Sequence, residues 1–352
     1  MKFIHCADLH LDSKFEYLPL EKAKIMREEL ISSFERMIDF AVKNGVEAVI
    51  IAGDLFDGIP MSNTISRVLV AVERAKDVDF LYLQGNHDEK NVFSDRAIPS
   101  NLKILNEKAF QYGDVTIAGL TANSEKFISN INRIKFDEKS LNILVLHGEI
   151  SAYENTTKNC ISLKSLKEKN IDYLALGHYH SYSCGKIDER GTYSYCGCLV
   201  GRGFDEVGEK GFNLLTVSDR KILSQFVPFA KLKFVEVEVD VSDCKSNYDV
   251  TTKAILIASA NKGSNAVKII LKGENRINEE VNVATIRNAL SDQFFFVKVV
   301  DDSVLGLDFE ELKYNKSLLG EFVRQVSKSN IENLTKNKVI MCGIKALKGE
   351  EL

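Results

Sequence analysis

Short apolar runs alternate with longer amphipathic stretches over roughly the first 225 residues. An uninterrupted apolar run is typical of a strand that is buried on both faces. Residues 48–52 form such a run, and further strands rich in apolar residues are expected at 2–7, 80–83, 142–146 and 173–176. Residues 20–43 instead carry apolar side chains at helical spacing and end at Asn44-Gly45, a common signal for the end of a helix. With a second helix expected over about 63–75, the pattern predicts α/β architecture.

The pattern becomes richer in strands after about residue 192. Pro228 marks the expected exit from the larger domain. Apolar and polar residues then alternate strictly over 234–241, which predicts a strand with one face exposed to solvent. A helix, a strand, a helix and a strand are then expected at 248–260, 266–271, 282–291 and 294–300. We therefore predict a larger domain over 1–229, a smaller α+β domain over 230–302 and an amphipathic helical tail over 303–352.

Charge distinguishes the tail from the rest of the chain. The net charge is -4, so any attraction for nucleic acid must come from a local patch. Between Lys313 and Lys348 the sequence has eight Lys or Arg against two Glu. This basic bias is consistent with a site for a protein partner, a site for DNA phosphates or a solvated helix face. The sequence does not choose among the three.

The cysteines and the hydropathy pattern favour a cytoplasmic protein. Seven cysteines form no regular framework, which is typical of reduced thiols. Cys196 and Cys198 are a weak candidate for a soft-metal site, because zinc sites normally need two further ligands. There is neither an apolar stretch of about 18 residues nor a basic leader followed by an apolar segment, so we expect no membrane association and no secretion.

The histidines are confined to the first 180 residues of the chain. All six precede position 181, and five of them stand in motifs that follow apolar runs. The five motifs are Asp8-Leu9-His10, Gly53-Asp54, Gly85-Asn86-His87-Asp88, His147-Gly148 and Gly177-His178-Tyr179-His180. Alone, nearly every one of them is consistent with a turn at a strand end, but together they indicate one polar site. His5, inside the first run, is expected to be a core or supporting residue. Asp57 could orient an imidazole or cap a loop.

The donor types in these motifs suit hydrolysis of phosphate esters. Two metal ions about 3.5–4 Å apart can activate water and counter the charge of a phosphate. Carboxylates, an amide oxygen and imidazoles are suitable ligands for Mn²⁺, Fe²⁺ or Zn²⁺. Because functional groups gather beyond the carboxyl ends of strands in open α/β sheets, we expect a two-metal site there.

The ordered motifs resemble those of the calcineurin-like metallophosphoesterase superfamily. Within it, the Asp8-Leu9-His10-Leu11 start and Gly53-Asp54-Leu55-Phe56-Asp57 resemble the SbcD-type DNA repair exonucleases. The segment 201–212 is also similar to the one that follows the last metal motif in those nucleases. The resemblance implies a four-layer αββα sandwich with a smaller C-terminal capping domain and a helical tail.

The resemblance also implies roles for individual residues. Asp8, His10 and His180 would hold one metal, Asn86, His147 and His178 the other, and Asp54 would bridge the two. His87 would face the scissile phosphate as a catalytic residue, with Asp88 holding its ring. The family usually uses manganese, although the same ligands suit iron and zinc. Archaeal relatives carry a histidine where Asp57 stands, so their finer specificity does not transfer.

The function that the resemblance implies is a two-metal DNA exonuclease and endonuclease in double-strand break repair. Its partner would be an SbcC-like ABC ATPase with a long coiled coil, bound through the C-terminal helices. Dimerisation through helices of the first domain is implied as well. The alternatives are a phosphomonoesterase or small-molecule phosphodiesterase with the same metals, and a non-catalytic assembly subunit. His87 followed by Asp88 favours the nuclease, and the complete set of ligand positions disfavours the assembly subunit.

Overall fold

The computed structural model describes most of the chain and divides it into two compact units. The described residues are 1–88, 92–93, 96–105, 108–121, 130, 136–151, 160–261, 263–275, 277, 280–305, 314 and 316–348. The first unit is Met1–Phe234 and the second is Val235–Leu352. The sequence predicts an irregular loop at 151–159, between the strands expected at 142–146 and 173–176, and its residues after Ser151 lie outside the described residues.

The first sheet of the first unit has six strands in the order β14-β13-β1-β2-β3-β4. Its parallel strands are β1 (Lys2–Cys6), β2 (Ala48–Ala52), β3 (Asp79–Leu83) and β4 (Leu102–Ile104). β13 (Gly211–Ser218) pairs antiparallel with β1, and β14 (Lys221–Pro228) pairs antiparallel with β13. The carboxyl ends of β1, β2 and β3 therefore lie next to one another at one edge.

The second sheet has six strands in the order β11-β12-β10-β7-β6-β5. Its parallel strands are β6 (Val115–Gly119), β7 (Leu141–His147), β10 (Tyr173–Gly177) and β12 (Thr192–Tyr195). β5 (Ala109–Tyr112) and β11 (Ser183–Lys186) are the antiparallel edge strands. A small parallel pair, β8 (Glu149–Ser151) and β9 (Cys160–Ser162), follows β7 along the chain.

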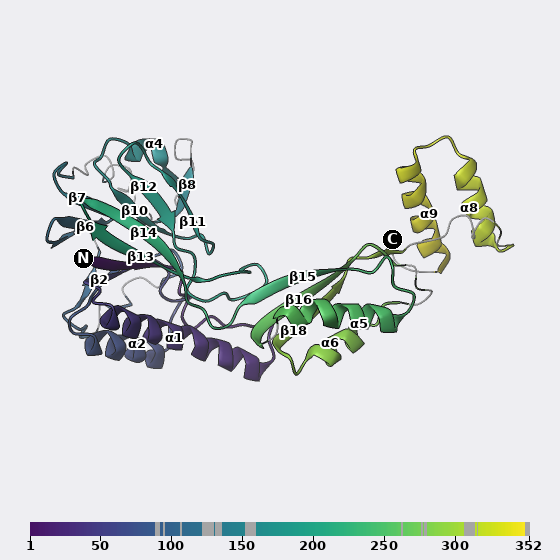
Figure 1. Cartoon of the computed structure of the whole chain (residues 1–352), viewed down its shortest axis with the longest axis horizontal. Coiled ribbons are helices and arrows are strands. Elements are labelled where there is room, and N and C mark those ends of the chain that lie inside the picture. The colour runs from purple at the N-terminus through teal and green to yellow at the C-terminus, as the bar shows by residue number, and fades with distance from the viewer. Residues whose placement is uncertain are drawn as a thin grey trace. The chain divides into compact units, whose positions relative to one another are not determined.

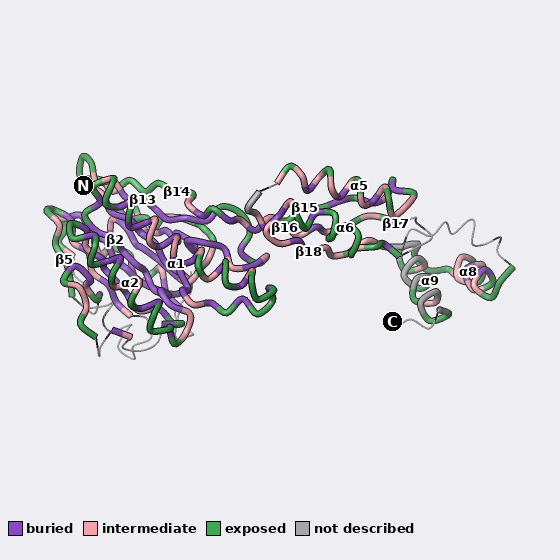
Figure 2. The backbone as a smooth tube through the Cα atoms, turned by 90° about the horizontal axis from the view of Figure 1, so that it is seen from below, coloured by how far each residue is buried: buried purple, intermediate pink, exposed green. Residues whose placement is uncertain are grey.

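The two sheets pack face to face, and their apolar side chains form one core. Ile50 and Leu81 from the first sheet belong to the same buried cluster as Val145 and Ala175 from the second. Figure 2 shows buried residues concentrated along these strands. The fully apolar runs of the sequence are therefore explained, because each central strand is covered on both of its faces.

Helices cover the outer faces of the two sheets (Figure 1). α1 (Leu20–Lys43) and α2 (Ser62–Arg74) lie side by side beneath the first sheet, where Phe40 of α1 packs against Phe212 of β13 with ring centroids 5.2 Å apart. The short α4 (Leu163–Leu166) adds Leu166 to the cluster on the outer face of the second sheet. The predicted helix–sheet–sheet–helix architecture is confirmed.

The first helix ends where the sequence predicted. Gly45 has φ +63°, a left-handed conformation that glycine adopts without steric cost. The backbone amide and the side-chain amide of Asn44 both donate to the carbonyl of Phe40, at 3.0 and 2.8 Å, and so close the last turn. The boundary is thus fixed by local chemistry that is readable in the sequence.

The second unit contains a three-stranded sheet in the order β15-β16-β18, formed by β15 (Phe234–Asp240), β16 (Gly263–Lys272) and β18 (Phe294–Asp301). α5 (Asn247–Ala258), with a 3₁₀ turn at Ser259–Asn261, and α6 (Val283–Leu290) contribute to a core around Val239 and Ile269. The strands β17 (Glu274–Asn275) and β19 (Val304–Leu305) form a short pair. The predicted α+β succession is therefore confirmed.

Two further helices follow in the tail, α8 (Leu318–Lys328) and α9 (Asn333–Lys348). They pack against each other through Val323 and Ile340, in agreement with the predicted amphipathic helical tail. Among the described residues of the whole chain, no helix is both long enough and apolar enough to cross a membrane.

Candidate metal centre

Five strands deliver polar side chains to one place. Asp8, Asp54 and Asn86 follow β1, β2 and β3 of the first sheet within a few residues. His147 is the last residue of β7 and His178 follows β10, both in the second sheet. Because these strands run parallel within each sheet and the sheets are stacked, their carboxyl ends meet at one rim.

The backbone at this rim adopts conformations that are rare for residues other than glycine. Asp8, His10, Asp54 and His178 have φ values of 52°, 44°, 51° and 106°. Hydrogen bonds between the loops hold them there: the amide of Asp8 donates to Gly53 at 3.1 Å and that of His10 to Asp54 at 3.0 Å. The amide of His178 donates to the Asp8 carboxylate at 3.0 Å. The first, second and fifth motifs therefore hold one another in position.

Asp8, His10 and His180 form a first group of donors. Nε2 of His10 lies 3.2 Å from Nε2 of His180, which is 4.0 Å from Oδ1 of Asp8. Each residue offers one ligand atom within 4.8 Å of the others. This is the set that the sequence resemblance implied for one metal.

Asn86, His147 and His178 form a second group, which Asp54 connects to the first. Oδ1 of Asn86 lies 2.9 Å from Nε2 of His147 and 3.2 Å from Nδ1 of His178. Oδ2 of Asp54 lies 3.2 Å from Nε2 of His147 and 3.7 Å from Nε2 of His10. One carboxylate thus faces donors of both groups.

The electrostatics of the buried carboxylates and imidazoles at this site favour the binding of a cation. Burial raises the pKa of the Asp8 carboxyl to about 7. At His147, burial opposes the charged form, but the hydrogen bond and the charge of Asp54 outweigh it and raise the pKa to about 9. In the absence of a cation, the carboxylates therefore draw a proton onto a buried imidazole. A divalent cation is the natural replacement for that proton.

The hydrogen bonding of His147 also fits metal binding. Its Nδ1 lies 2.9 Å from the carbonyl oxygen of Ala52, an atom that can only accept. Nδ1 therefore carries the hydrogen, and the neutral ring has its lone pair on Nε2, which faces Asp54 and Asn86. The donor set and its orientation both suit a pair of divalent ions.

His87 lies at the edge of the centre beside Asp57. The His87 side chain is 53% exposed, and its Nδ1 is 3.5 Å from Oδ1 of Asp57. Asp57 also faces Nδ1 of His10 at 3.8 Å and accepts a hydrogen bond from the Ser13 hydroxyl at 2.8 Å. Of the two roles left open for Asp57, the structure favours contact with imidazoles.

The expectation that Asp88 holds the His87 ring is wrong. Asp88 is buried, and its two carboxylate oxygens accept from the amides of Phe56 at 2.8 Å and Gly85 at 2.9 Å. These bonds fasten the third motif to the loop after β2, so the carboxylate supports the backbone rather than the imidazole. Asp57 occupies the place beside His87 instead.

His5 is a core residue, one of the two roles expected for it. It is fully buried, with Nδ1 3.0 Å from the Tyr173 hydroxyl and Nε2 3.2 Å from the carbonyl of Leu176. Cys196 and Cys198 are buried as well, and neither belongs to a group of potential metal donors among the described residues.

Glu206 and Arg202 are site residues that the sequence did not single out. Oε1 of Glu206 lies 2.6 Å from Nδ1 of His180, and Arg202 donates to the same oxygen at 2.9 Å. Burial opposes ionisation of Glu206, but the hydrogen bond from His180 and the charge of Arg202 lower its pKa to about 2. Both residues stand in the segment 201–212, whose resemblance to the nucleases was the only sequence signal for them.

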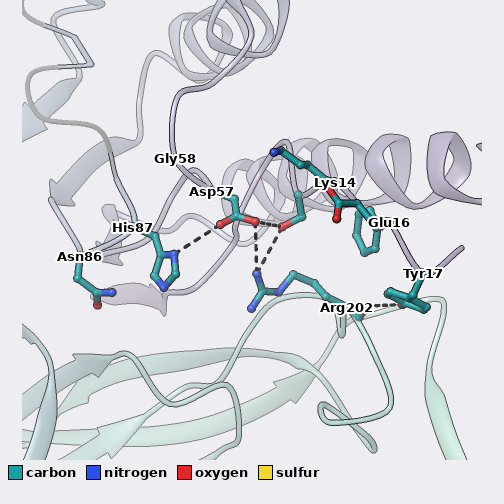
Figure 3. A pocket seen from close by; sticks show the side chains of 10 residues that line it. Lys14, Glu16, Tyr17, Asp57, Gly58, Asn86, His87 and Arg202 are labelled. Carbon is teal, nitrogen blue, oxygen red and sulfur yellow. Dashed lines mark hydrogen bonds and ion pairs between the residues drawn. The ribbon is translucent and has the colours of Figure 1, made fainter.

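A cavity of about 800 Å³ opens beside His87 and Asn86 (Figure 3). Its other lining residues are Ser13, Lys14, Phe15, Glu16, Tyr17, Asp57, Gly58 and Arg202. The Tyr17 hydroxyl donates to the carbonyl of Arg202, which joins the two sides of the cavity. There is room here for a substrate next to the imidazole of His87.

Comparisons with known proteins agree with this geometry. A family model described as calcineurin-like phosphoesterase matches residues 1–182. A Bacillus subtilis protein, uncharacterized metallophosphoesterase YhaO, is 29% identical over 70% of this chain and 64% of its own length. The DNA double-strand break repair protein Mre11 of Methanosarcina acetivorans is 21% identical over 97% of this chain and 60% of its own.

A subunit of the nuclease SbcCD from Staphylococcus saprophyticus is 24% identical over 67% of this chain and 71% of its own length. The chain spans between 40% and 64% of the first five curated relatives that it matches. The resemblance to the SbcD and Mre11 nucleases is therefore confirmed at the level of family.

Proposed function

This chain belongs to the calcineurin-like phosphoesterase family, and on that basis we propose that it is a two-metal nuclease that hydrolyses phosphodiester bonds in DNA. The relatives Mre11 and the SbcCD nuclease subunit support the SbcD/Mre11 type within the family and a metal-dependent hydrolase as the general activity. DNA as the substrate and double-strand break repair as the setting are the proposed part.

The position of Asp54 carries the proposal. Its Oδ2 faces His147 at 3.2 Å and His10 at 3.7 Å, which suits a carboxylate shared by two ions. We assign Asp8, His10 and His180 to one ion and Asn86, His147 and His178 to the other. Manganese is the proposed metal, and iron and zinc suit the same donors.

The residues of the chain divide the chemical work. Bound divalent ions would lower the pKa of the attacking water and counter the charge on the phosphate. His87 stands at the mouth of the cavity, where its imidazole would donate a proton to the leaving oxygen. Asp57 faces Nδ1 of that ring at 3.5 Å and would hold the imidazole in position.

A polynucleotide fits the surroundings of the centre better than a small phosphate ester. The cavity extends from His87 past the exposed Lys14, whose positive charge suits a second phosphate of the same strand. Tyr17, half exposed at the cavity, offers a ring on which a base can stack. A phosphomonoester would leave these groups unused, which is why the rival phosphomonoesterase activity ranks second.

We further propose that α8 and α9 bind an SbcC-like ATPase in the cytoplasm. α8 buries Val323 against Ile340 of α9, yet Leu318 stays 73% exposed and Leu347 stays 47% exposed. Such apolar side chains beside a basic surface suit a protein helix better than bare DNA phosphates. Co-purification of the ATPase with the whole chain, lost in a variant with Leu318→Glu and Leu347→Glu, would support this partner.

The nuclease proposal is tested with purified protein and Mn²⁺ on linear double-stranded DNA, single-stranded DNA and a chromogenic phosphodiester. We expect the wild type to cleave DNA and His87→Ala to lose this cleavage. Calorimetry should show that the variant still binds both metals. Hydrolysis of the chromogenic phosphodiester without cleavage of DNA would contradict the nuclease proposal and favour a small-molecule phosphodiesterase. No turnover with full metal occupancy, in the presence as well as the absence of the ATPase, would favour the assembly subunit.

A further inference from the structure

Glu206 is a buried carboxylate that belongs to none of the five metal motifs. Only 4% of the residue is exposed, and both of its oxygens are occupied. Oε1 accepts from Arg202 Nη2 at 2.9 Å and lies 2.6 Å from Nδ1 of His180. Oε2 accepts from the Arg202 amide at 2.7 Å and from the Cys198 thiol at 3.5 Å. Its position is therefore fixed from several directions.

The contact with His180 decides which ring nitrogen carries hydrogen. A carboxylate held by an arginine is ionised, so it can only accept, and at a separation of 2.6 Å Nδ1 of His180 donates to it. Nη2 of Arg202 also lies 3.1 Å from Nδ1, but it donates to Oε1 of Glu206 at the shorter distance of 2.9 Å. In the neutral ring this leaves the lone pair on Nε2, which faces His10 at 3.2 Å and Asp8 at 4.0 Å. The other tautomer would present an N–H to the metal and could not bind it.

The same segment also holds the backbone of His180. Lys210 is buried, and its ammonium donates to the carbonyl oxygen of His180 at 2.7 Å. The amide of Cys198 donates to that oxygen at 3.4 Å. Residues 198–210 thus hold both the ring and the main chain of one proposed ligand.

The two donor groups differ in how their histidines are oriented. His147, in the second group, is oriented by the neutral carbonyl of Ala52 at 2.9 Å. His180, in the first group, is oriented by a full negative charge. A carboxylate partner makes the ligating nitrogen more basic than a carbonyl does, so removing it should weaken one ion more than the other.

We propose that Glu206, held in place by Arg202, is a positioning residue that selects the metal-binding tautomer of His180 and thereby sets the affinity of the first metal group. This inference rests on the proposed assignment of His180 as a metal ligand. It gives the segment 201–212 a definite role: its charged pair acts on the metal through His180.

The test is calorimetric titration of the metal-free protein with Mn²⁺ alone. In Glu206→Gln, one of the two binding events is expected to weaken by about 10- to 100-fold while the other is unchanged. Glu209→Gln is the matched control, because Glu209 lies in the same segment but is 51% exposed and pairs with Lys233. It should leave both events unchanged. Equal weakening of both events in Glu206→Gln, or no weakening of either, would overturn the proposal.

A second measurement does not depend on how the variant folds. ¹⁵N NMR of the imidazoles in the wild-type protein should show His180, assigned with a His180→Gln variant, with its hydrogen on Nδ1. A hydrogen on Nε2 of the neutral wild-type ring would overturn the proposal. Both readouts are separate from DNA cleavage, so an inactive wild type with the expected tautomer would count against the nuclease and not against the role of Glu206.

Discussion

Oδ1 of Asp57 lies 3.5 Å from Nδ1 of His87 and 3.8 Å from Nδ1 of His10, so a single carboxylate faces an imidazole of the metal centre and the imidazole proposed to act on the substrate. Asp88, next to His87 in the sequence, instead accepts two backbone amides. Asp57, which lies beside His87 in space, and Asp88, which follows it in sequence, therefore have different roles. Substitution of each residue can distinguish the two roles.

Asp57→Asn should lower turnover of the Mn²⁺-loaded protein by about 10- to 100-fold, because the imidazole of His87 loses the carboxylate that faces its Nδ1. Metal content, measured by calorimetry, should change much less, because Asp57 lies 3.8 Å from Nδ1 of His10, beyond hydrogen-bond distance. Asp88→Asn is the paired variant, and it should reduce the free energy of unfolding by about 1–3 kcal/mol, since two buried amides lose a charged acceptor. Lost turnover in Asp88→Asn at unchanged stability, with full turnover in Asp57→Asn, would reverse these assignments.

Gly85→Ala should destroy metal binding. A Cβ at this position would overlap Oδ1 and the backbone nitrogen of Asp54, which cannot withdraw without moving the carboxylate that faces both donor groups. Gly45→Ala is a suitable control because Gly45 has φ +63° and an added Cβ meets no atom within 4 Å. The control should cost about 1 kcal/mol in urea unfolding and keep metal binding intact. Normal Mn²⁺ titration of Gly85→Ala would contradict the steric argument.

His5 should make the metal-free protein sensitive to mild acid. Burial lowers the pKa of His5 to about 3, from an ordinary value of 6.5. Its contribution to stability is complete above pH 6.5, and it is lost as the pH falls, because only the unfolded chain then binds the proton. Between pH 6.5 and 5 this loss amounts to about 2 kcal/mol.

The measurement is the difference in unfolding free energy between pH 7 and pH 5, for wild type and His5→Gln. Glutamine cannot take up the proton, so the variant should lose less stability over this interval, whatever its absolute stability at pH 7. An identical pH dependence in the two proteins would mean that His5 does not titrate as its burial requires.

Chelation of metal should lower the melting temperature of the wild type. The buried carboxylates of Asp8 and Asp54 lie among imidazoles, and together these groups would bind a cation. Because a ligand at 100 times its dissociation constant stabilises the folded state by about 2.7 kcal/mol, removal of the cation lowers stability. Excess Mn²⁺ should restore the original value. Asp54→Asn should respond much less to either reagent, and a full response in that variant would argue against its shared position between the ions.

The sequence was most informative where structure depends on local signals. The end of α1 followed from Asn44-Gly45, and strand patterns rich in apolar residues identified β1, β2, β7 and β10, with polar motifs at their ends. The carboxyl ends of parallel strands in stacked sheets lie at one edge, so the grouping of Asp8, Asp54 and His147 was also predictable.

What the sequence could not provide depends on the paths of loops. Asp57 and Asp88 are both plausible partners for His87, and only the bonds from Phe56 and Gly85 to Asp88 decide between them. Glu206 reaches His180 across 26 positions of sequence, a separation for which no periodicity exists. Pro228 was expected to mark the exit from the larger domain and is the last residue of β14, whereas the division into units falls later, after Phe234.

The left-handed backbone at Asp8, His10, Asp54 and His178 has a consequence for protein engineering. Grafting only these side chains onto an ordinary strand–loop junction would aim them wrongly, because the scaffold would not accept positive φ at four non-glycine positions. The unit that could be transferred is the set of loops together with the hydrogen bonds that their backbone amides donate to Gly53, Asp54 and Asp8. For the same reason, asparagine is a cleaner replacement than alanine at Asp8 and Asp54, since it tolerates that backbone and removes only the charge.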